Sequence, residues 1–438
     1  MNSSVLRQMY KNKDLRKRLG VVVLVLFVYA IISNIPVPVP DTIKLQSFLL
    51  RLFQSNPLLG FANLFSGGAM TNFSIILMGL GPYINASIII QLLTQVVPSL
   101  NALSKEGESG RNKINYYTRL LTVPLALIQS VAMIFFVQKT SQQIAGVDLI
   151  GKPSPFQWVL MVATITAGSM LLMWLGEIIT DRGIGNGISI LIVAGIVSGL
   201  PATISQQISL LQADPSKLVG IIAIALVFLA TIVAVVFINE GQRNIPVSYA
   251  RRTSASQAYG SVDTHLPLKV IIAGVIPIIF SLAFLQVPAF VGQLLSSAKT
   301  QWVASLAQQM ARWFAPTSPV YAITYFILVV AFTYFYTAII FKPTEIAENL
   351  QKQGGFIPGI RPGKETSSYL KRVVNRITLF GALALGLLAI LPFILQAFVK
   401  SSSSLSIGGT SLLIVVAVAI ETMRQVEAKA LTATYEQY

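Results

Sequence analysis

Few residues in this sequence could carry out catalysis. The 438-residue chain has no cysteine and a single histidine, His265, in a predicted loop beside Pro267. Disulfides, thiolate metal sites and nucleophiles activated by histidine therefore have little support. A lone histidine of this kind is more often structural than catalytic. We predict that the chain is not an enzyme and uses no metal and no cofactor.

Two glycine-containing motifs could suggest a nucleotide site. Gly183-Ile-Gly-Asn-Gly187 lacks the full GxGxxG spacing, and no strand is plausible before it. Lys105-Glu-Gly-Glu-Ser-Gly-Arg111 is not a Walker A loop. Neither motif predicts nucleotide binding, so any energy for transport has to come from a partner.

The composition indicates a membrane as the solvent. Hydrophobic residues make up 54% of the chain and charged residues only 11%, about half the usual share of a soluble domain. The net charge of +16 suggests anionic partners. Basic residues lie in short loops between apolar runs rather than along one continuous face, which disfavours a nucleic-acid-binding protein.

The apolar runs predict membrane-spanning helices, which need about 20 apolar residues each. The first follows a basic segment, as in a signal peptide, but no small-x-small cleavage site follows it, so we interpret it as an uncleaved span. An all-α integral membrane protein with ten spans is expected. The predicted spans are 19–36, 73–97, 118–138, 156–179, 184–202, 216–238, 268–290, 318–341, 376–398 and 408–425.

The distribution of Lys and Arg predicts the orientation. With the amino terminus placed in the cytoplasm, about three quarters of the 32 basic residues fall in cytoplasmic segments. Both termini are then cytoplasmic, and two long cytoplasmic loops are expected at 239–267 and 342–375. An arrangement of five spans plus five suggests pseudo-symmetric halves at 1–202 and 203–438, although the halves have no obvious sequence similarity.

The expected spans lack charge at their centres. The 16 acidic residues fall in loops, tails or span ends, and no basic residue lies in mid-span. Carriers coupled to protons or ions usually keep an ionisable residue there. A carrier for a neutral solute remains an alternative. An intramembrane enzyme would need a buried Ser/His, Asp/Asp or zinc set, which the spans do not provide.

A short irregular segment lies directly before the second expected span. Residues 58–73 are moderately apolar, too short to cross a membrane, and interrupted by Gly67-Gly68. Non-helical backbone at membrane depth is tolerated only inside protein or beside a water-filled cavity. The segment is either a re-entrant half-helix or a helix lying on the outer leaflet.

Seven motifs resemble those of the SecY/Sec61 translocon channel family, in order and spacing, over nearly the whole chain, with bacterial rather than archaeal character. They are Asn63-Leu-Phe-Ser-Gly-Gly-Ala69, Gly81-Pro-Tyr-Ile-Asn-Ala-Ser-Ile88, Lys105-Glu-Gly-Glu-Ser-Gly-Arg111, Trp174-Leu-Gly-Glu177 with Asp181-Arg-Gly-Ile-Gly-Asn-Gly-Ile-Ser189, Thr264-His-Leu-Pro-Leu-Lys269, Phe356-Ile-Pro-Gly-Ile-Arg-Pro-Gly363 and Gly408-Gly-Thr-Ser-Leu-Leu-Ile414.

The resemblance implies an hourglass-shaped channel of two halves, closed by a re-entrant plug and able to open sideways to lipid. The implied plug, at about 61–72, includes Asn63, Leu64, Phe65, Ser66, Gly67 and Gly68. The implied pore ring is Leu80, Ile84, Ile188, Ile192, Ile279 and Ile414, with Leu80 where many relatives have isoleucine. Polar residues implied at the lateral gate are Gln91 and Thr94. Basic residues implied in partner docking are Arg243, Arg251, Arg252, Arg361, Lys364 and Arg372.

The resemblance also implies what the channel works with. Expected partners are the small membrane subunits SecE and SecG, the SecA ATPase, the ribosome, signal-bearing nascent polypeptides and anionic lipids. The expected location is the plasma (inner) membrane. Spacing supports the ring independently, because Leu80 with Ile84 and Ile188 with Ile192 are i,i+4 pairs that each share one helix face. Such a ring could seal a pore by excluding water.

Overall fold

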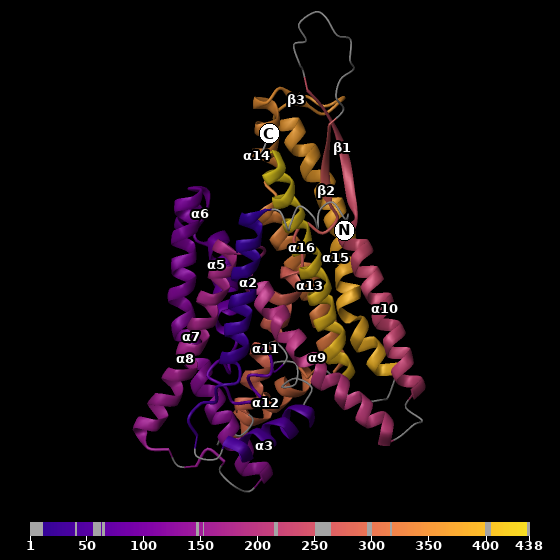
Figure 1. Cartoon of the computed structure of the whole chain (residues 1–438). Helices are drawn as coiled ribbons and strands as arrows, with labels where there is room; N and C mark the ends of the chain where they lie inside the picture. Colours follow the sequence, from indigo (N-terminus) through magenta and orange to yellow (C-terminus); the bar gives the residue numbers. More distant parts are fainter. Residues whose placement is uncertain are drawn as a thin grey trace, which may run out of the picture.

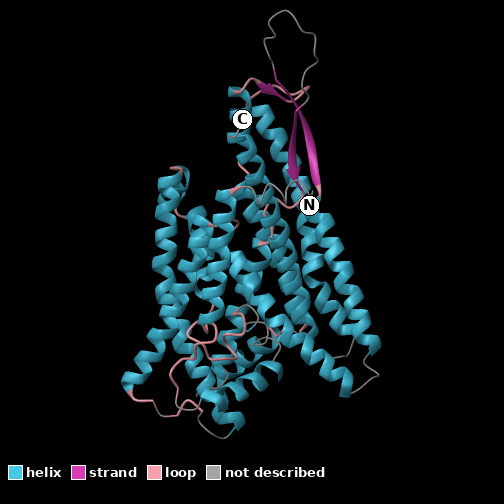
Figure 2. Ribbon diagram, viewed as in Figure 1, coloured by secondary structure: helices cyan, strands magenta, loops and turns pink. Residues whose placement is uncertain are grey.

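The computed structural model is almost entirely helical (Figures 1 and 2). It describes residues 12–39, 42–55, 63, 66–145, 149–151, 153–213, 218–249, 264–295, 300–315, 318–398 and 404–435. Most of the helices run side by side along one direction, and a β-hairpin projects from one end of the bundle (Figure 2). The sheet has three antiparallel strands in the order β2-β1-β3.

The elements follow the apolar pattern of the sequence closely. The helices are α2 (Lys13–Ile32), α3 (Thr42–Ser55), α5 (Gly81–Val96), α6 (Pro98–Lys105), α7 (Glu108–Ala145), α8 (Pro155–Arg182), α9 (Gly187–Ala213), α10 (Leu218–Glu240), α11 (Ile276–Leu295), α12 (Gln301–Trp313), α13 (Pro319–Ile340), α14 (Pro343–Lys352), α15 (Lys364–Phe398) and α16 (Ser404–Tyr435). The strands are β1 (Gln242–Tyr249), β2 (Thr264–Lys269) and β3 (Gly355–Phe356).

Each of the expected spans overlaps a helix, but the span count stays a prediction. Within the described residues, four helices are long and apolar enough to cross a membrane: Glu108–Gln142, Pro155–Arg182, Pro319–Lys352 and Lys364–Ile394. The bent pair α5 and α6, which meet at 99°, would make a fifth. The division into halves also stays a prediction, and α9 continues beyond the expected boundary at 202.

The second expected span, 73–97, is wrong in its first part. Residues 66–80 form consecutive turns, and the helix begins only at Gly81. The turns require positive φ at Gly79 (φ 55°) and at Phe73 (φ 44°), which no helix contains. Pro82 then occupies the first turn of α5, where its missing N–H costs no hydrogen bond.

The seventh expected span, 268–290, also begins too early. The chain is still extended at Lys269, which pairs with Gln242 in the β1–β2 ladder. A left-handed residue, Gly274 (φ 62°), follows, and α11 starts at Ile276. Hydropathy assigns the whole apolar run to the membrane, but its first residues are strand residues because β2 pairs with β1.

Gly183-Ile-Gly-Asn-Gly187 forms a tight connection between α8 and α9. A Cβ atom on Gly187 would overlap the carbonyl oxygen of Gly176, so the two helices meet backbone to backbone. The Asn186 side chain caps α9 by accepting hydrogen bonds from the N–H groups of Ile188 (3.1 Å) and Ser189 (3.2 Å). Close packing and capping explain these residues without a nucleotide.

One hydrophobic core joins the two ends of the sequence. It contains buried side chains from α2, α5, α8, α9, α11, α13, α15 and α16, together with Ala69 and Ile76 of the turn segment. A smaller cluster brings Leu15 of α2 against Val426 and Ala430 of α16. The first and last described helices therefore meet at the same end of the molecule, as an even number of spans requires.

Gly187→Ala tests the close approach of α8 and α9. The added methyl has no space, so we expect it to destabilise the fold by about 1–3 kcal/mol and to lower the midpoint of thermal unfolding in detergent. Gly20→Ala in α2, where a Cβ meets nothing within 4 Å, is the matched control. Equal midpoints for the two variants would contradict this packing.

Candidate functional site

The six residues of the implied pore ring are brought together in the large hydrophobic core. Five of them are buried members of this core, and each exposes 0–7% of its surface: Leu80, Ile84, Ile192, Ile279 and Ile414. The sixth, Ile188, is partly buried and packs against the core. They come from four places in the sequence. Their role in a pore stays a prediction; the structure places them in one large hydrophobic core that also contains aromatic side chains.

Helix starts position most of these side chains. Leu80 immediately precedes α5, and its carbonyl accepts the hydrogen bond of the Ile84 N–H at 3.0 Å. Ile188 and Ile192 lie in the first turns of α9, and Ile279 lies in the first turn of α11. The i,i+4 relation expected from the sequence therefore holds for both pairs.

The turn segment at 66–80 packs directly on this cluster. Its Ala69 and Ile76 are fully buried in the same core as the ring. The segment is tied to the end of α2, because the Val37 N–H bonds to the Phe73 carbonyl (2.8 Å) and the Ile75 N–H bonds to the Ile35 carbonyl (3.0 Å). Non-helical backbone is thus satisfied by protein on the inside of the bundle.

Gly67 is the tightest contact of this segment. Its φ of 66° favours glycine, and a Cβ there would overlap the Tyr29 hydroxyl and lie 2.9 Å from the Cα of Gly195. The Tyr29 hydroxyl donates to the Ser66 carbonyl at 3.2 Å. Ser198 Oγ lies 3.3 Å from the Gly67 carbonyl, and also 2.8 Å from that of Gly195. Helices α2 and α9 therefore hold the segment from two sides.

Part of the implied plug can be followed in atomic detail. The Asn63 side chain accepts from the Thr71 N–H (3.0 Å), and the Asn63 carbonyl accepts from Ser66 Oγ (2.9 Å) and the Gly68 N–H (2.9 Å). These bonds close the segment on itself. Leu64 and Phe65 lie outside the described residues.

The polar residues expected at a lateral gate bond within their own helix. Gln91 Nε2 donates to Ser87 Oγ at 3.0 Å, and Thr94 Oγ1 donates to the Gln91 carbonyl at 2.6 Å. Their role at a lateral gate stays a prediction; hydroxyl and amide side chains readily pair one turn back in this way. Gln91 Oε1 is buried and has no hydrogen-bond partner among the residues that the structure describes.

Helices α5 and α7 meet α11 along one seam. Contacts between α5 and α11 bring an early span against a late one. The rings of Phe136 in α7 and Phe290 in α11 lie 6.3 Å apart. On its other side, α11 packs on α13 through edge-to-face contacts of Phe280 with Phe332 and Tyr336. An aromatic contact therefore lies on the seam between α7 and α11, and α13 packs behind α11 through further aromatic contacts, so α11 and α13 together form that side of the seam.

The two long loops fold into one projecting head with its own core. Buried residues of β1, β2, α14 and the start of α15 pack together there, among them Ile245, Leu268, Leu350 and Leu370. Arg243 on β1, and Arg361, Lys364 and Arg372 beside or on α15, are exposed on the head. Arg251 and Arg252 lie outside the described residues.

Arg361 is held by its neighbours in sequence. Gly359 (φ 80°) and Gly363 (φ 98°) take left-handed conformations on either side of it. The Arg361 carbonyl accepts a hydrogen bond from Thr366 Oγ1 at 2.9 Å. The backbone at this arginine is therefore fixed while the guanidinium remains exposed.

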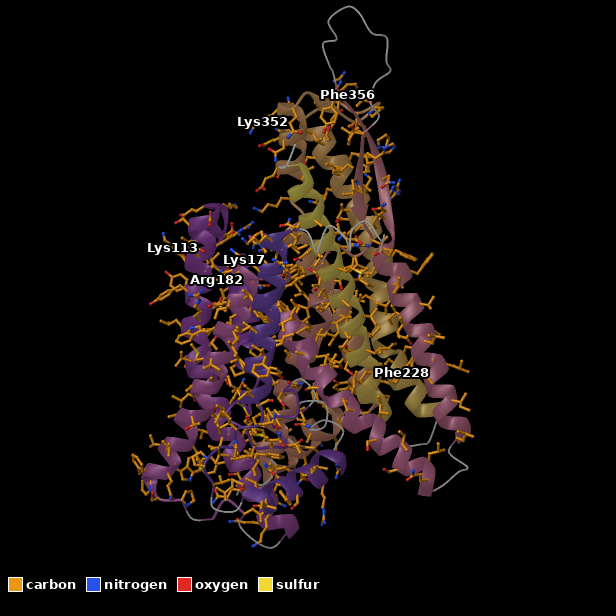
Figure 3. All side chains as sticks on the ribbon, in the orientation of Figure 1. Lys17, Lys113, Arg182, Phe228, Lys352 and Phe356 are labelled. Carbon is orange, nitrogen blue, oxygen red and sulfur yellow. The ribbon has the colours of Figure 1, made fainter. Side chains whose placement is uncertain are left out.

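Charged side chains join the head to the bundle. Arg424 of α16 pairs with Glu240 Oε1 at 2.7 Å and donates to the Asn239 carbonyl at 3.1 Å. Lys269, the last residue of β2, lies nearby, where burial and then Arg424 lower its pKa while Glu421 and Glu240 act in the opposite direction. Figure 3 shows four further basic side chains toward the same end as the head, namely Lys17, Lys113, Arg182 and Lys352.

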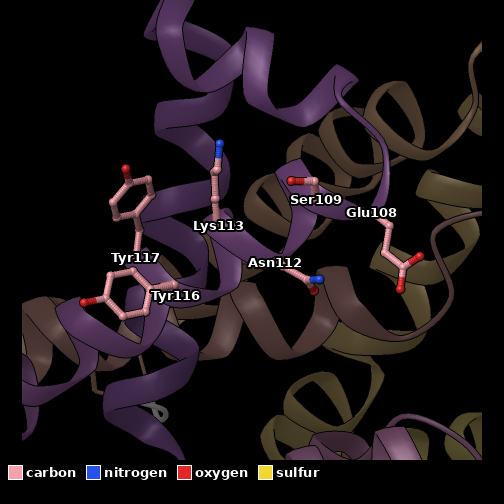
Figure 4. Close-up of a pocket in the computed structure, with 6 residues that line it drawn as sticks. All are labelled: Glu108, Ser109, Asn112, Lys113, Tyr116 and Tyr117. Carbon is pink, nitrogen blue, oxygen red and sulfur yellow. The ribbon is translucent and has the colours of Figure 1, made fainter.

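A shallow hollow near this end carries little chemistry. It is lined by Glu108, Ser109, Asn112, Lys113, Tyr116 and Tyr117, all on the first turns of α7 (Figure 4). Glu108 and Lys113 carry charges of opposite sign, and both tyrosines point outward from the helix. Nothing in its lining indicates a ligand.

Comparison with solved structures identifies the class of fold. One is "The structure of a protein conducting channel", with a TM-score of 0.67 and 20% identity over 94% of this chain and 92% of that one. Another is Sec61 in a canine ribosome-channel complex, with a TM-score of 0.63 and 19% identity over 94% and 92%. This chain therefore has the fold of these channels.

Sequence comparison gives the family. A family model described as SecY matches residues 74–423. Relatives named "Protein translocase subunit SecY" are 40% identical in Streptomyces galbus, over 98% of both chains, and 43% identical in Pseudomonas aeruginosa, over 97% of this chain and 92% of the relative. The chain belongs to the SecY family.

Sequence reasoning missed the residues that hold the turn segment. Tyr29, Gly195 and Ser198 lie in ordinary apolar runs, with no local pattern that distinguishes them. The one available signal was a hydroxyl on each of two expected spans, which suggests an internal hydrogen-bond partner. Identifying that partner required the fold.

Tyr29→Phe tests how the turn segment is held. Loss of the hydroxyl removes one buried hydrogen bond, worth about 1 kcal/mol, so local opening should increase about five-fold. We expect faster hydrogen–deuterium exchange in the peptide covering 66–75. Tyr117→Phe, on an exposed tyrosine of α7, is the control. Identical exchange in the two variants would mean that the hydroxyl does not hold the segment.

Proposed function

We propose that this chain is the pore-forming subunit of a protein translocase, which passes unfolded polypeptides across a membrane. The observation that carries the proposal is that the six ring residues lie in one hydrophobic core together with Ala69 and Ile76 of the non-helical turn segment. Relatives of the same length are named as translocase subunits, and structural neighbours are named as protein-conducting channels. Its proposed location is the plasma (inner) membrane, with both termini cytoplasmic.

The ring would seal the resting channel. A hydrated ion loses much of its water shell between aliphatic side chains, and transferring a charge to an apolar medium costs on the order of tens of kcal/mol in the Born limit. An extended polypeptide can pass, because the flexible Ile and Leu side chains can move apart and then close around it. In this proposal, a conformation with the ring packed in the core, as it is here, would be the closed state.

The segment that contains Asn63, Ser66, Gly67 and Gly68 would act as the plug. A structural neighbour is described as having a plug domain that stabilises the closed state of the translocation channel. Here the few hydrogen bonds to Tyr29 and Ser198 are each worth about 1 kcal/mol. Such a contact set is weak enough to be displaced by an entering chain.

The seam between α5/α7 and α11/α13 would serve as the lateral gate for hydrophobic segments. Apolar contacts there can be exchanged for contacts with lipid at little cost. Gln91 Oε1, buried without a partner, would accept a hydrogen bond from a polypeptide entering the seam. Each central Leu of a signal sequence favours lipid by roughly 0.5 kcal/mol, so a core of 10–15 apolar residues gains several kcal/mol by leaving sideways.

The basic head would receive the partners that drive transport. Arg243, Arg361, Lys364 and Arg372 are exposed there, and a rigid arginine suits phosphate or carboxylate groups. The proposed partners are the ribosome, whose RNA is anionic, and the SecA motor ATPase. Sec61 and Ssh1 structures with similar folds are described in ribosome complexes. SecE and SecG would join as small membrane subunits, and anionic lipids would neutralise the remaining basic residues.

Crosslinking of a stalled, signal-bearing nascent chain tests the pore. Because the chain has no cysteine, single cysteines at Ile84 and Ile192 report without background. We expect both to crosslink to the nascent chain. A cysteine at Ile222 of α10, exposed on the outside of the bundle, is the control and should react with none. Crosslinks from Ile84 and Ile192 only to lipid or neighbouring helices would exclude the pore.

Arg361→Glu tests docking on the head. Charge reversal should weaken binding of the driving partner on the order of ten-fold and reduce partner-driven export, while membrane insertion and thermal stability stay near normal. Arg51→Glu, an exposed arginine on α3 at the other end of the molecule, is the matched control. Unchanged export with Arg361→Glu would remove Arg361 from the docking site.

A further inference from the structure

Helix α12 (Gln301–Trp313) packs against the end of α11 at very short range. A Cβ atom on Gly292 of α11 would lie 2.8 Å from the Ala311 nitrogen and 2.9 Å from the Ala307 carbonyl oxygen. Ala307 is buried, and Val303 and Met310 are partly buried on the same side of the helix. The two helices therefore contact each other backbone to backbone, as one rigid corner.

The neighbouring side of α12, roughly a quarter turn around the helix axis from the buried residues, exposes large apolar side chains. Trp302 is 71% exposed, Leu306 43% and Trp313 55%. At 3.6 residues per turn, the spacing i, i+4, i+11 places all three within a narrow sector of one helix face. No other element of the described residues covers this face. Polar residues, including Ser305, Gln308 and Arg312, flank it.

The exposed face of α12 lies at the end of an apolar surface on α11 that is also exposed. An exposed apolar stripe runs along α11 and ends near α12. Its residues have i, i+3, i+7, i+11 spacing and are Phe284, Val287, Val291 and Leu295. Figure 1 shows α12 at the end of the bundle opposite to β1 and β2. A helix of 13 residues is too short to span a membrane, and its mixed polar and apolar sides suit the boundary of one.

We propose that α12 is an anchor that lies in the membrane interface at the end away from the basic head. Its ligand is the lipid of that leaflet. Trp302 and Trp313 sit at headgroup level, because indole combines an apolar ring with one N–H donor. Leu306 between them enters the upper acyl chains, and Arg312 reaches lipid phosphate.

The anchor has a consequence for α11. Since α11 and α12 meet backbone to backbone at Gly292, the depth of α12 in the interface sets the height of α11 in the membrane. That consequence concerns the lateral gate and rests on the proposed function. The lipid contact of α12 does not, and can be measured without any transport assay.

Quenching of tryptophan fluorescence by brominated lipids tests the anchor. The chain has 4 tryptophans, so variants that keep only Trp302 or only Trp313 are made by Trp→Phe at the other three. They are placed in phosphatidylcholine vesicles with bromine near the headgroup or near the chain ends. We expect strong loss of emission with the shallow bromine and much weaker loss with the deep bromine. Phe356→Trp on the head, in a tryptophan-free chain, is the control and should be quenched by neither.

Three outcomes would overturn the proposal. Emission lost to acrylamide in water, but to neither brominated lipid, would place the face in solvent. Protection from acrylamide and from both lipids, with energy transfer between labelled copies, would assign the face to a second copy of the chain. Stronger quenching by the deep bromine would place α12 inside the bilayer. If the single-tryptophan chains do not fold, W302F and W313F are introduced together into the otherwise native chain, which should lose shallow quenching.

Discussion

The structure depends on one constraint, which is that backbone N–H and C=O groups inside a membrane need partners from the protein itself. Helices meet that need locally, but the segment at 66–80 is not helical and must borrow partners from elsewhere. It obtains them from two residues that follow α2, Ile35 and Val37, and from the Tyr29 hydroxyl. A segment held in this way is ordered without being part of a helix, which is what a removable plug requires.

The same constraint keeps charged side chains away from the proposed polypeptide path through the bundle. Ionisable groups are costly at the bilayer centre. The ion pairs Arg424–Glu240 and Arg119–Glu177 lie at the ends of the expected spans rather than at their centres. The large core of the bundle consists of apolar and aromatic side chains, and in the proposed mechanism the aliphatic ring residues block ions. Basic residues are concentrated on a head that folds around its own hydrophobic core, where anionic partners can bind without entering the membrane.

Helix α11 connects several parts of the proposed mechanism. Its first turn carries Ile279 of the ring, its middle lies on the seam with α7, and its end is packed on α12. A movement of this helix would alter the seal and the seam together. In the proposed mechanism, lipid at one end and the β-hairpin at the other would therefore act on the same helix.

The sequence by itself determined the class of protein and its chemistry. A charged fraction of 11% with long apolar runs is incompatible with water on all sides, and the motifs indicated the family and the six ring residues. Only the tertiary structure decided that α5 begins at Gly81 and α11 at Ile276, and that Tyr29 and Ser198 hold the turn segment. Hydropathy reports the solvent that each residue prefers, whereas the start of a helix depends on whether a distant strand or side chain already satisfies the backbone.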